Sequence, residues 1–154
     1  MIVYRFSHQK FASDLSGYGA RIKGGRWNPV GISVLYTSES ISLALLEILA
    51  NALSLKELKM FHLMEIEVPK INLIQEIKVE HLKKEWYFDF DYTQWMGKEV
   101  LQSNQSLLVK CPSALVHKEH NYLINPMHKD FKKIALGKTA DFYFDDRLFK
   151  KQTN

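Results

Sequence analysis

The chain has 154 residues, a length typical of one domain that buries about 70% of the surface its unfolded form exposes. Its composition is that of an ordinary globular protein, which excludes a fibrous or intrinsically disordered chain. The net charge of +4 comes from basic residues scattered along the sequence, so it does not mark a nucleic-acid-binding protein. We therefore expect one domain over residues 1–154 that has a weak preference for anionic ligands and does not bind nucleic acid directly.

The sequence also constrains the compartment. Its single cysteine, Cys111, cannot form an internal disulfide and suits a reducing cytosol. Because it lies in the apolar stretch LLVKCPSALV, we expect a buried, unreactive thiol. The first ten residues have no apolar signal-peptide core, and no run approaches the ~18 apolar residues of a membrane span. These features predict a cytoplasmic protein with no membrane contact.

Hydrophobic periodicity predicts a mixture of strands and helices. In chain order the pattern predicts strands at 2–6, 32–37, 61–68, 107–109, 114–117, 122–124 and 142–144. It predicts helices at 38–54, 76–86 and 92–103, with Ser38 as the N-cap of the first. The elements do not alternate regularly, as they would in a doubly wound sheet. We therefore expect an α+β fold, with a small mixed sheet and flanking helices.

The stretch GGRWN at 24–28 has the glycines that a turn requires, but also an arginine and a tryptophan that a turn does not require. Glycines such as Gly25 let a backbone approach a pyrophosphate closely, and the Arg26 guanidinium can bind phosphate oxygens with two parallel hydrogen bonds. The spacing matches neither a Walker A loop nor a Rossmann fingerprint. A surface arginine in a glycine turn remains the alternative. Trp27 and Asn28 either line a binding site or anchor this loop in the core.

Glu47, in the predicted helix 38–54, is a candidate functional carboxylate. From periodicity alone it is one charge on the polar stripe of an amphipathic helix. Leu43, Leu46 and Ala50 make the far side of the helix apolar as well. A helix that is apolar almost all round is usually buried, and a buried carboxylate needs a partner or a function.

Three further residues have ordinary structural explanations when taken singly. Arg5 interrupts an apolar strand, which is typical of the solvent side of an edge strand. Tyr36 would pack in the core with its hydroxyl reaching water, and Ser113 would be a structural serine at a strand end. The polar residues at 120–128 have no metal-ligand spacing, so we expect no metal.

Taken together and in order, these segments resemble the RES-domain family, the toxin components of bacterial toxin–antitoxin pairs. The matching pieces span almost the whole chain: YRF at 4–6, GGRWNPVG at 24–31, VLYTS at 34–38, LALLE at 43–47, PSALV at 112–116, NYLINPMH at 121–128 and FDDRL at 144–148. The resemblance implies a small split sheet similar to that of diphtheria-toxin-like ADP-ribosyltransferases. It also implies NAD as the substrate and no further cofactor.

The resemblance implies the roles of particular residues as well. The family's functional residues fall here on Arg5, Arg26, Tyr36, Glu47 and Ser113. The resemblance further implies a partner antitoxin with an Xre-like DNA-binding region. Family members degrade NAD by hydrolysis or by phosphorolysis with inorganic phosphate, and some modify protein targets.

The chemistry of NAD fits a site that has one carboxylate. The nicotinamide is a pyridinium that leaves as a neutral molecule, so its departure needs no general acid, and one of the two carboxylates of ordinary glycoside hydrolysis becomes unnecessary. We expect Glu47 to stabilise the oxocarbenium-like charge, and Arg5 and Arg26 to hold the diphosphate. Tyr36 would pack against nicotinamide, and Ser113 would bind its amide or the ribose.

Three hypotheses stay open at this point. The first is growth arrest by NAD degradation, and the second is transfer of ADP-ribose to a macromolecule through the same site. The third is a non-catalytic basic binding module, which would be indifferent to Glu47→Gln and would bind less tightly as salt rises.

Overall fold

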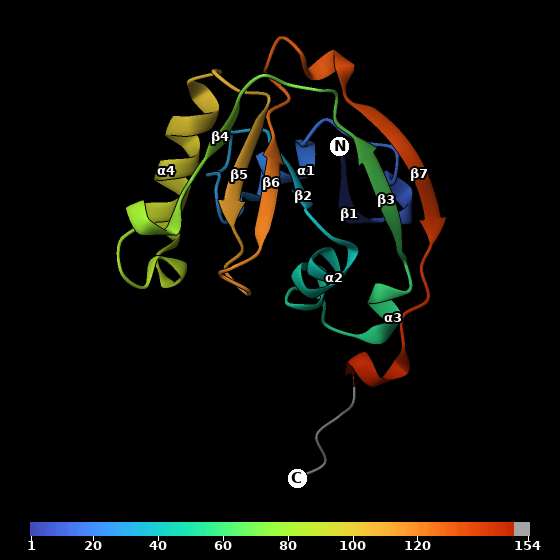
Figure 1. The fold of residues 1–154 in the computed structure, drawn as a ribbon. Coiled ribbons are helices and arrows are strands. Elements are labelled where there is room, and N and C mark those ends of the chain that lie inside the picture. The colour runs from blue at the N-terminus through green and yellow to red at the C-terminus, as the bar shows by residue number, and fades with distance from the viewer. Residues whose placement is uncertain (150–154) are drawn as a thin grey trace.

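The computed structural model describes residues 1–149, so the last five residues of the predicted domain lie outside it. Within this range the chain forms one mixed seven-stranded sheet in the order β4-β5-β6-β2-β1-β3-β7 (Figure 1). The strands are β1 Ile2–His8, β2 Leu35–Ser38, β3 Phe61–Glu67, β4 Ile74–Glu76, β5 Leu108–Pro112, β6 His120–Ile124 and β7 Ala135–Asp141. The α-helices are α1 Tyr18–Lys23, α2 Ile41–Leu49, α3 Leu55–Leu58 and α4 Phe90–Gln102. This confirms the predicted α+β class.

The sheet is split between β1 and β2. These neighbours share the single residue pair Tyr4–Ser38, whereas β1 and β3 pair over their full lengths, from Ile2–Glu67 to His8–Phe61. Figure 1 shows the halves β4-β5-β6-β2 and β1-β3-β7 diverging, with α2 beyond the end of β2. The end of β2 therefore leads directly into the helix that carries Glu47.

Two apolar clusters hold α4 and α2 against the sheet. Trp27, Trp86 and Leu123 belong to the cluster between α4 and the β5-β6-β2 half. Phe6 and Ala44 belong to the cluster between α2 and β1. Each half of the sheet thus packs against a helix of its own.

Several predicted elements begin or end elsewhere. The helix 92–103 is confirmed as α4, whereas the helix 38–54 is shorter than predicted: α2 has Ser40 rather than Ser38 as its N-cap and ends at Leu49, and α3 begins only at Leu55. Ser40 Oγ accepts a hydrogen bond from the Leu43 amide at 3.1 Å, and Ser54 caps the second helix. The strand 32–37 begins only at Leu35, and the short helix α1 was not predicted.

Three predicted elements are wrong. The helix 76–86 is replaced by β4 and two short 3-10 helices, because Ile77 N donates to Lys110 O of β5 and continues the sheet pairing. The strand 114–117 is a turn, since Ser113 Oγ accepts from the amides of Leu115 and Val116. Residues 142–144 do not form a strand; they follow β7, which ends at Asp141. Within residues 1–149 no helix is long and apolar enough to cross a bilayer.

Candidate functional site

The Glu47 carboxylate is fixed by two side chains, one from the residue that follows β5 and one from β6. Glu47 is half-buried on α2, and its Oε1 atom accepts a hydrogen bond from Ser113 Oγ at 2.8 Å. The same oxygen accepts a second hydrogen bond from Asn121 Nδ2 at 2.6 Å. Hydrogen bonds to an ionised acceptor are the stronger kind, so this carboxylate has a defined orientation.

Ser113 is completely buried at the end of β5, and the geometry determines the direction of its hydrogen bond. Its oxygen already accepts from the amides of Leu115 and Val116. A hydroxyl has one proton to donate, and the Glu47 carboxylate is the acceptor placed to receive it. Ser113 therefore anchors Glu47, and this contact occupies the hydroxyl that we expected to bind nicotinamide or ribose.

The GGRWN loop is built around Asn28, which is fully buried. Its Nδ2 donates to the carbonyl oxygens of Ala20 and Ile32, at 2.8 and 2.9 Å, and Oδ1 accepts from the Tyr36 hydroxyl at 2.6 Å. Tyr36 in turn accepts from Trp27 N at 2.9 Å. Burial raises the pKa of Tyr36 well above the usual range, so the phenol remains a donor to Asn28.

Gly25 is required by this close packing. A Cβ at Gly25 would lie 2.7 Å from the Tyr36 hydroxyl oxygen and 2.9 Å from Asn28 Oδ1. Trp27 is 2% exposed and packs against Trp86 in a tilted arrangement with a ring-centroid distance of 5.6 Å. The side chains of Trp27 and Asn28 therefore anchor the loop in the core, and any part they play in binding comes through the shape of the loop.

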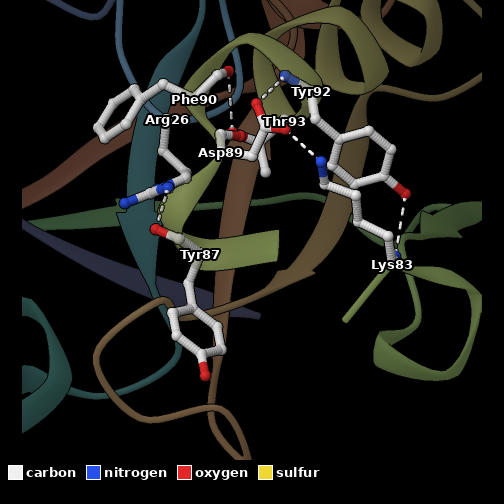
Figure 2. Close-up of polar contacts among 7 residues, drawn as sticks. All are labelled: Arg26, Lys83, Tyr87, Asp89, Phe90, Tyr92 and Thr93. Atoms are coloured by element: carbon white, nitrogen blue, oxygen red, sulfur yellow. Dashed lines mark hydrogen bonds and ion pairs between the residues drawn. The ribbon is translucent and has the colours of Figure 1, made fainter. Parts of the chain in front are cut away.

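Arg26 is held by residues at the start of α4 and just before it. Its Nη1 donates to the Tyr87 carbonyl at 2.7 Å, and its Cζ lies 4.0 Å from the centroid of the Phe90 ring (Figure 2). Within residues 1–149 neither Nε nor Nη2 makes a hydrogen bond, so both are available to an anion. Partial burial lowers the pKa of Arg26, and the nearby Glu47 charge opposes that effect.

The segment that holds Arg26 is itself secured by Asp89 (Figure 2). Asp89 caps α4 by accepting from Tyr92 N at 3.0 Å, and it forms an ion pair with Lys83. Phe90 is half exposed and lines a surface cavity of about 440 Å³ together with Phe88. The ring beside Arg26 is thus accessible from solvent.

Arg5 occupies an internal strand, so the edge-strand interpretation is wrong. Its Nη1 donates to the Tyr36 carbonyl across the split at 3.3 Å, while its buried Nε has no hydrogen-bond partner within residues 1–149. Burial lowers the pKa of Arg5, and Asp14 opposes that effect. No hydrogen bond or ion pair joins Arg5 to Glu47 within the same residues, so the link of Arg5 to the other predicted residues is its hydrogen bond to the Tyr36 carbonyl.

The predicted residues thus fall into two groups joined by β2. Tyr36 on β2 is hydrogen-bonded to the loop that carries Arg26. Ser38, two residues later on the same face of β2, is hydrogen-bonded to Asn121 in the group around Glu47. Sequence reasoning missed Ser38 and Asn121 as members of the site. Their signal was present, since both are polar residues within the motifs VLYTS and NYLINPMH.

Cys111 behaves as the sequence predicts. Its side chain is fully buried, and burial, with a contribution from the Glu47 charge, raises the pKa of the thiol. A thiol that stays protonated is a poor nucleophile. Among residues 1–149 no group of three or more His, Cys, Asp or Glu side chains is arranged to hold a metal ion.

The fold and site define a class: a small α+β protein with a split sheet, one anchored carboxylate at the split and an arginine in a glycine-rich loop beside it. The RES domain family matches residues 2–145, and the chain belongs to that family. The family resemblance of the sequence motifs is thereby confirmed.

Curated relatives match over nearly their full lengths. The chain is 38% identical to the protein named Toxin Res from Photorhabdus laumondii, over 97% of this chain and 98% of the relative. It is 36% identical to Toxin Res from Yersinia enterocolitica, over 96% and 99%. It is also 36% identical to a Sphingobium protein named Prs ADP-ribosylating toxin, over 91% and 89%.

A solved structure confirms the fold. It is a chain of the M. tuberculosis MbcT–MbcA toxin–antitoxin complex, which aligns with a TM-score of 0.74 at 19% identity. The alignment covers 92% of this chain and 83% of the other.

Proposed function

We propose that this protein cleaves the bond between nicotinamide and ribose in NAD, as the toxin of a toxin–antitoxin pair. The observation that carries the proposal is the single anchored carboxylate. Glu47 receives hydrogen bonds from Ser113 and Asn121, and within residues 1–149 no second carboxylate shares these donors. Ordinary glycoside hydrolysis needs an acid as well, but nicotinamide leaves as a neutral molecule and needs none.

Each group then has a distinct role. Glu47 stabilises the positive charge that develops on the ribose as the bond breaks, and it orients the incoming acceptor. Arg26, with two nitrogens unengaged, binds the diphosphate and orients the substrate. Arg5 adds positive charge at the split through a guanidinium whose Nε is still unpaired.

Release of nicotinamide by purified, antitoxin-free protein tests the proposal. We expect release by the wild type and its loss in Glu47→Gln, whose circular dichroism should match the wild type. Adding inorganic phosphate separates the two acceptors, because phosphorolysis requires phosphate and hydrolysis does not. A folded wild type that releases no nicotinamide, or a Glu47→Gln variant with full activity, would contradict the proposal.

Transfer of ADP-ribose to a protein is the second candidate, favoured by the Sphingobium relative named an ADP-ribosylating toxin. It uses the same bond cleavage with a different acceptor. Incubation with NAD labelled in the adenylate part distinguishes the two. Label that becomes attached to protein in a cell extract supports transfer, whereas free ADP-ribose or its phosphate supports degradation.

An antitoxin partner follows from the same proposal. The aligned solved structure is a toxin–antitoxin complex, and the three curated relatives described above are all named toxins. We propose that the partner carries an Xre-like DNA-binding region and blocks the site. Co-expression with the neighbouring reading frame should restore growth and co-purify that protein, and a growth arrest that no neighbouring frame relieves would contradict this part.

A further inference from the structure

A chain of hydrogen bonds connects β2 to the Glu47 carboxylate through Asn121. The sheet register places Ser38 and Asn121 directly opposite one another on β2 and β6. Ser38 Oγ and Asn121 Oδ1 lie 2.7 Å apart, and Asn121 Nδ2 lies 2.6 Å from Glu47 Oε1. Ser38 is 4% exposed, so its hydroxyl is committed to this contact.

The direction of the chain follows from elementary hydrogen-bond chemistry. An ionised carboxylate only accepts, so the amide group of Asn121 must turn its nitrogen toward Glu47. Its oxygen then faces Ser38, whose hydroxyl donates to it. Ser38 therefore holds the amide in the one orientation that serves the carboxylate.

Both donors end on the same carboxylate oxygen. Ser113 and Asn121 each bond Oε1, and within residues 1–149 no hydrogen bond reaches Oε2. The two donors come from β5 and β6, which are paired through Cys111–Asn121, so their positions are set by the sheet rather than by α2. The carboxylate is thus oriented by one oxygen and leaves the other unengaged.

We infer that Asn121 is a positioning residue that, with Ser38 behind it, fixes Oε1 so that Oε2 is the oxygen that acts on the ribose of NAD. This inference rests on the proposed function of Glu47. It assigns the reacting atom of the carboxylate, and it gives a role to the last residue of the motif VLYTS and to the first residue of NYLINPMH, which face one another in the sheet.

Replacement of Asn121 by Asp is the sharpest test, because it keeps the shape and replaces the donor with an acceptor. We expect kcat for nicotinamide release to fall about 10- to 100-fold, the worth of a hydrogen bond to a charged group, while KM for NAD changes by less than about twofold. Ser38→Ala removes only the support of the amide. It should lower kcat about two- to fivefold, since a neutral hydrogen bond is worth less.

Asn51→Ala is the matched control. Asn51 Nδ2 donates to the backbone carbonyl of Glu47 at 2.9 Å on the exposed side of α2, so the control removes a hydrogen bond to the same residue but not to its carboxylate. This variant should keep the wild-type kcat. Circular dichroism checks each variant, and Ser38→Ala decides the outcome if Asn121→Asp does not fold.

The outcomes separate this inference from the proposed function. Wild-type release that is lost in Glu47→Gln, with kcat lowered by Asn121→Asp and Ser38→Ala, supports both. The inference alone is overturned if Glu47→Gln is inactive while these two variants keep the wild-type kcat. It is also overturned if Asn121→Asp raises KM and leaves kcat unchanged, since Asn121 would then bind substrate. Absence of release by the wild type overturns the proposed function itself.

Discussion

The residues around Glu47 and the loop that carries Arg26 are held in place in different ways. Glu47 is held by side chains that project from paired strands, and every donor in its chain of contacts is a serine hydroxyl or an asparagine amide. Arg26 is held by the backbone carbonyl of Tyr87, before α4, and by the ring of Phe90, the first residue of α4. The carboxylate is thus fixed by the sheet, whereas the guanidinium is fixed by a loop.

This difference matches the two tasks that we propose. A group that stabilises a transition state must be preorganised, and strand ends give that rigidity. A group that binds a flexible diphosphate gains from retaining adjustable donors, and Arg26 keeps two nitrogens unengaged. Changes near Glu47 should therefore alter kcat, and changes near Arg26 should alter KM or the stability of the loop.

The largest effect on stability that we expect comes from Gly97→Ala, which disrupts the packing of α4 against the loop that carries Arg26. Gly97 is buried in α4, where a Cβ would lie 1.9 Å from the Trp27 carbonyl oxygen. The helix would have to move away from the loop, at a cost of about 3 kcal/mol or more of unfolding free energy. Urea unfolding measures this change.

Gly19→Ala provides the control for that substitution. Gly19 lies in α1, and a Cβ there would have no neighbour within 4 Å. This variant should be more stable than the wild type by up to about 1 kcal/mol, because alanine favours a helix. A Gly97→Ala protein as stable as Gly19→Ala would refute the close contact between α4 and the loop.

A smaller effect is expected from Tyr36→Phe, which removes the hydroxyl shared by Trp27 and Asn28. Loss of these buried hydrogen bonds should cost about 2 kcal/mol at neutral pH. Because burial raises the pKa of Tyr36 in the folded state, its contribution is complete below the unfolded pKa near 10 and declines as pH rises above it. Urea midpoints from pH 8 to 11 should show the gap between wild type and variant narrowing above about pH 10, and a constant gap would contradict this.

Arg26→Lys tests the proposed role of Arg26 in binding NAD. Lysine keeps the charge but loses the planar fork that binds two oxygens at once, so KM for NAD should rise about tenfold with kcat nearly preserved. Steady-state nicotinamide release gives both constants. A fall in kcat at unchanged KM would place Arg26 in bond cleavage rather than in binding.

The smallest effect should come from Phe90→Ala. The ring supports the guanidinium from one face, and an exposed contact of this kind is worth about 0.5–1 kcal/mol. We expect KM to rise about two- to fivefold and the melting temperature to stay close to the wild type. Phe88→Ala, which removes a neighbouring and more exposed ring that makes no cation–π contact with Arg26 within residues 1–149, should leave KM unchanged.

The sequence allowed the class of fold and the members of the Arg26 loop to be predicted, because alternation and glycine spacing are local signals. The helix predicted at 76–86 failed because pairing of β4 with β5 overrides local periodicity. Asn121 was missed as a partner of Glu47 for a related reason, although Ser113 was among the predicted site residues. Asn121 lies 74 positions from Glu47 along the chain, and only the β2-β6 and β5-β6 registers bring it to the carboxylate.

The central claim is that Glu47 acts in bond cleavage and does not hold the substrate. Its most direct test measures NAD binding by calorimetry and nicotinamide release on the same preparation of Glu47→Gln. We predict an affinity for NAD within about threefold of the wild type and a kcat lowered at least about 100-fold. A variant that binds NAD much more weakly but turns over bound NAD at the wild-type rate would contradict the claim.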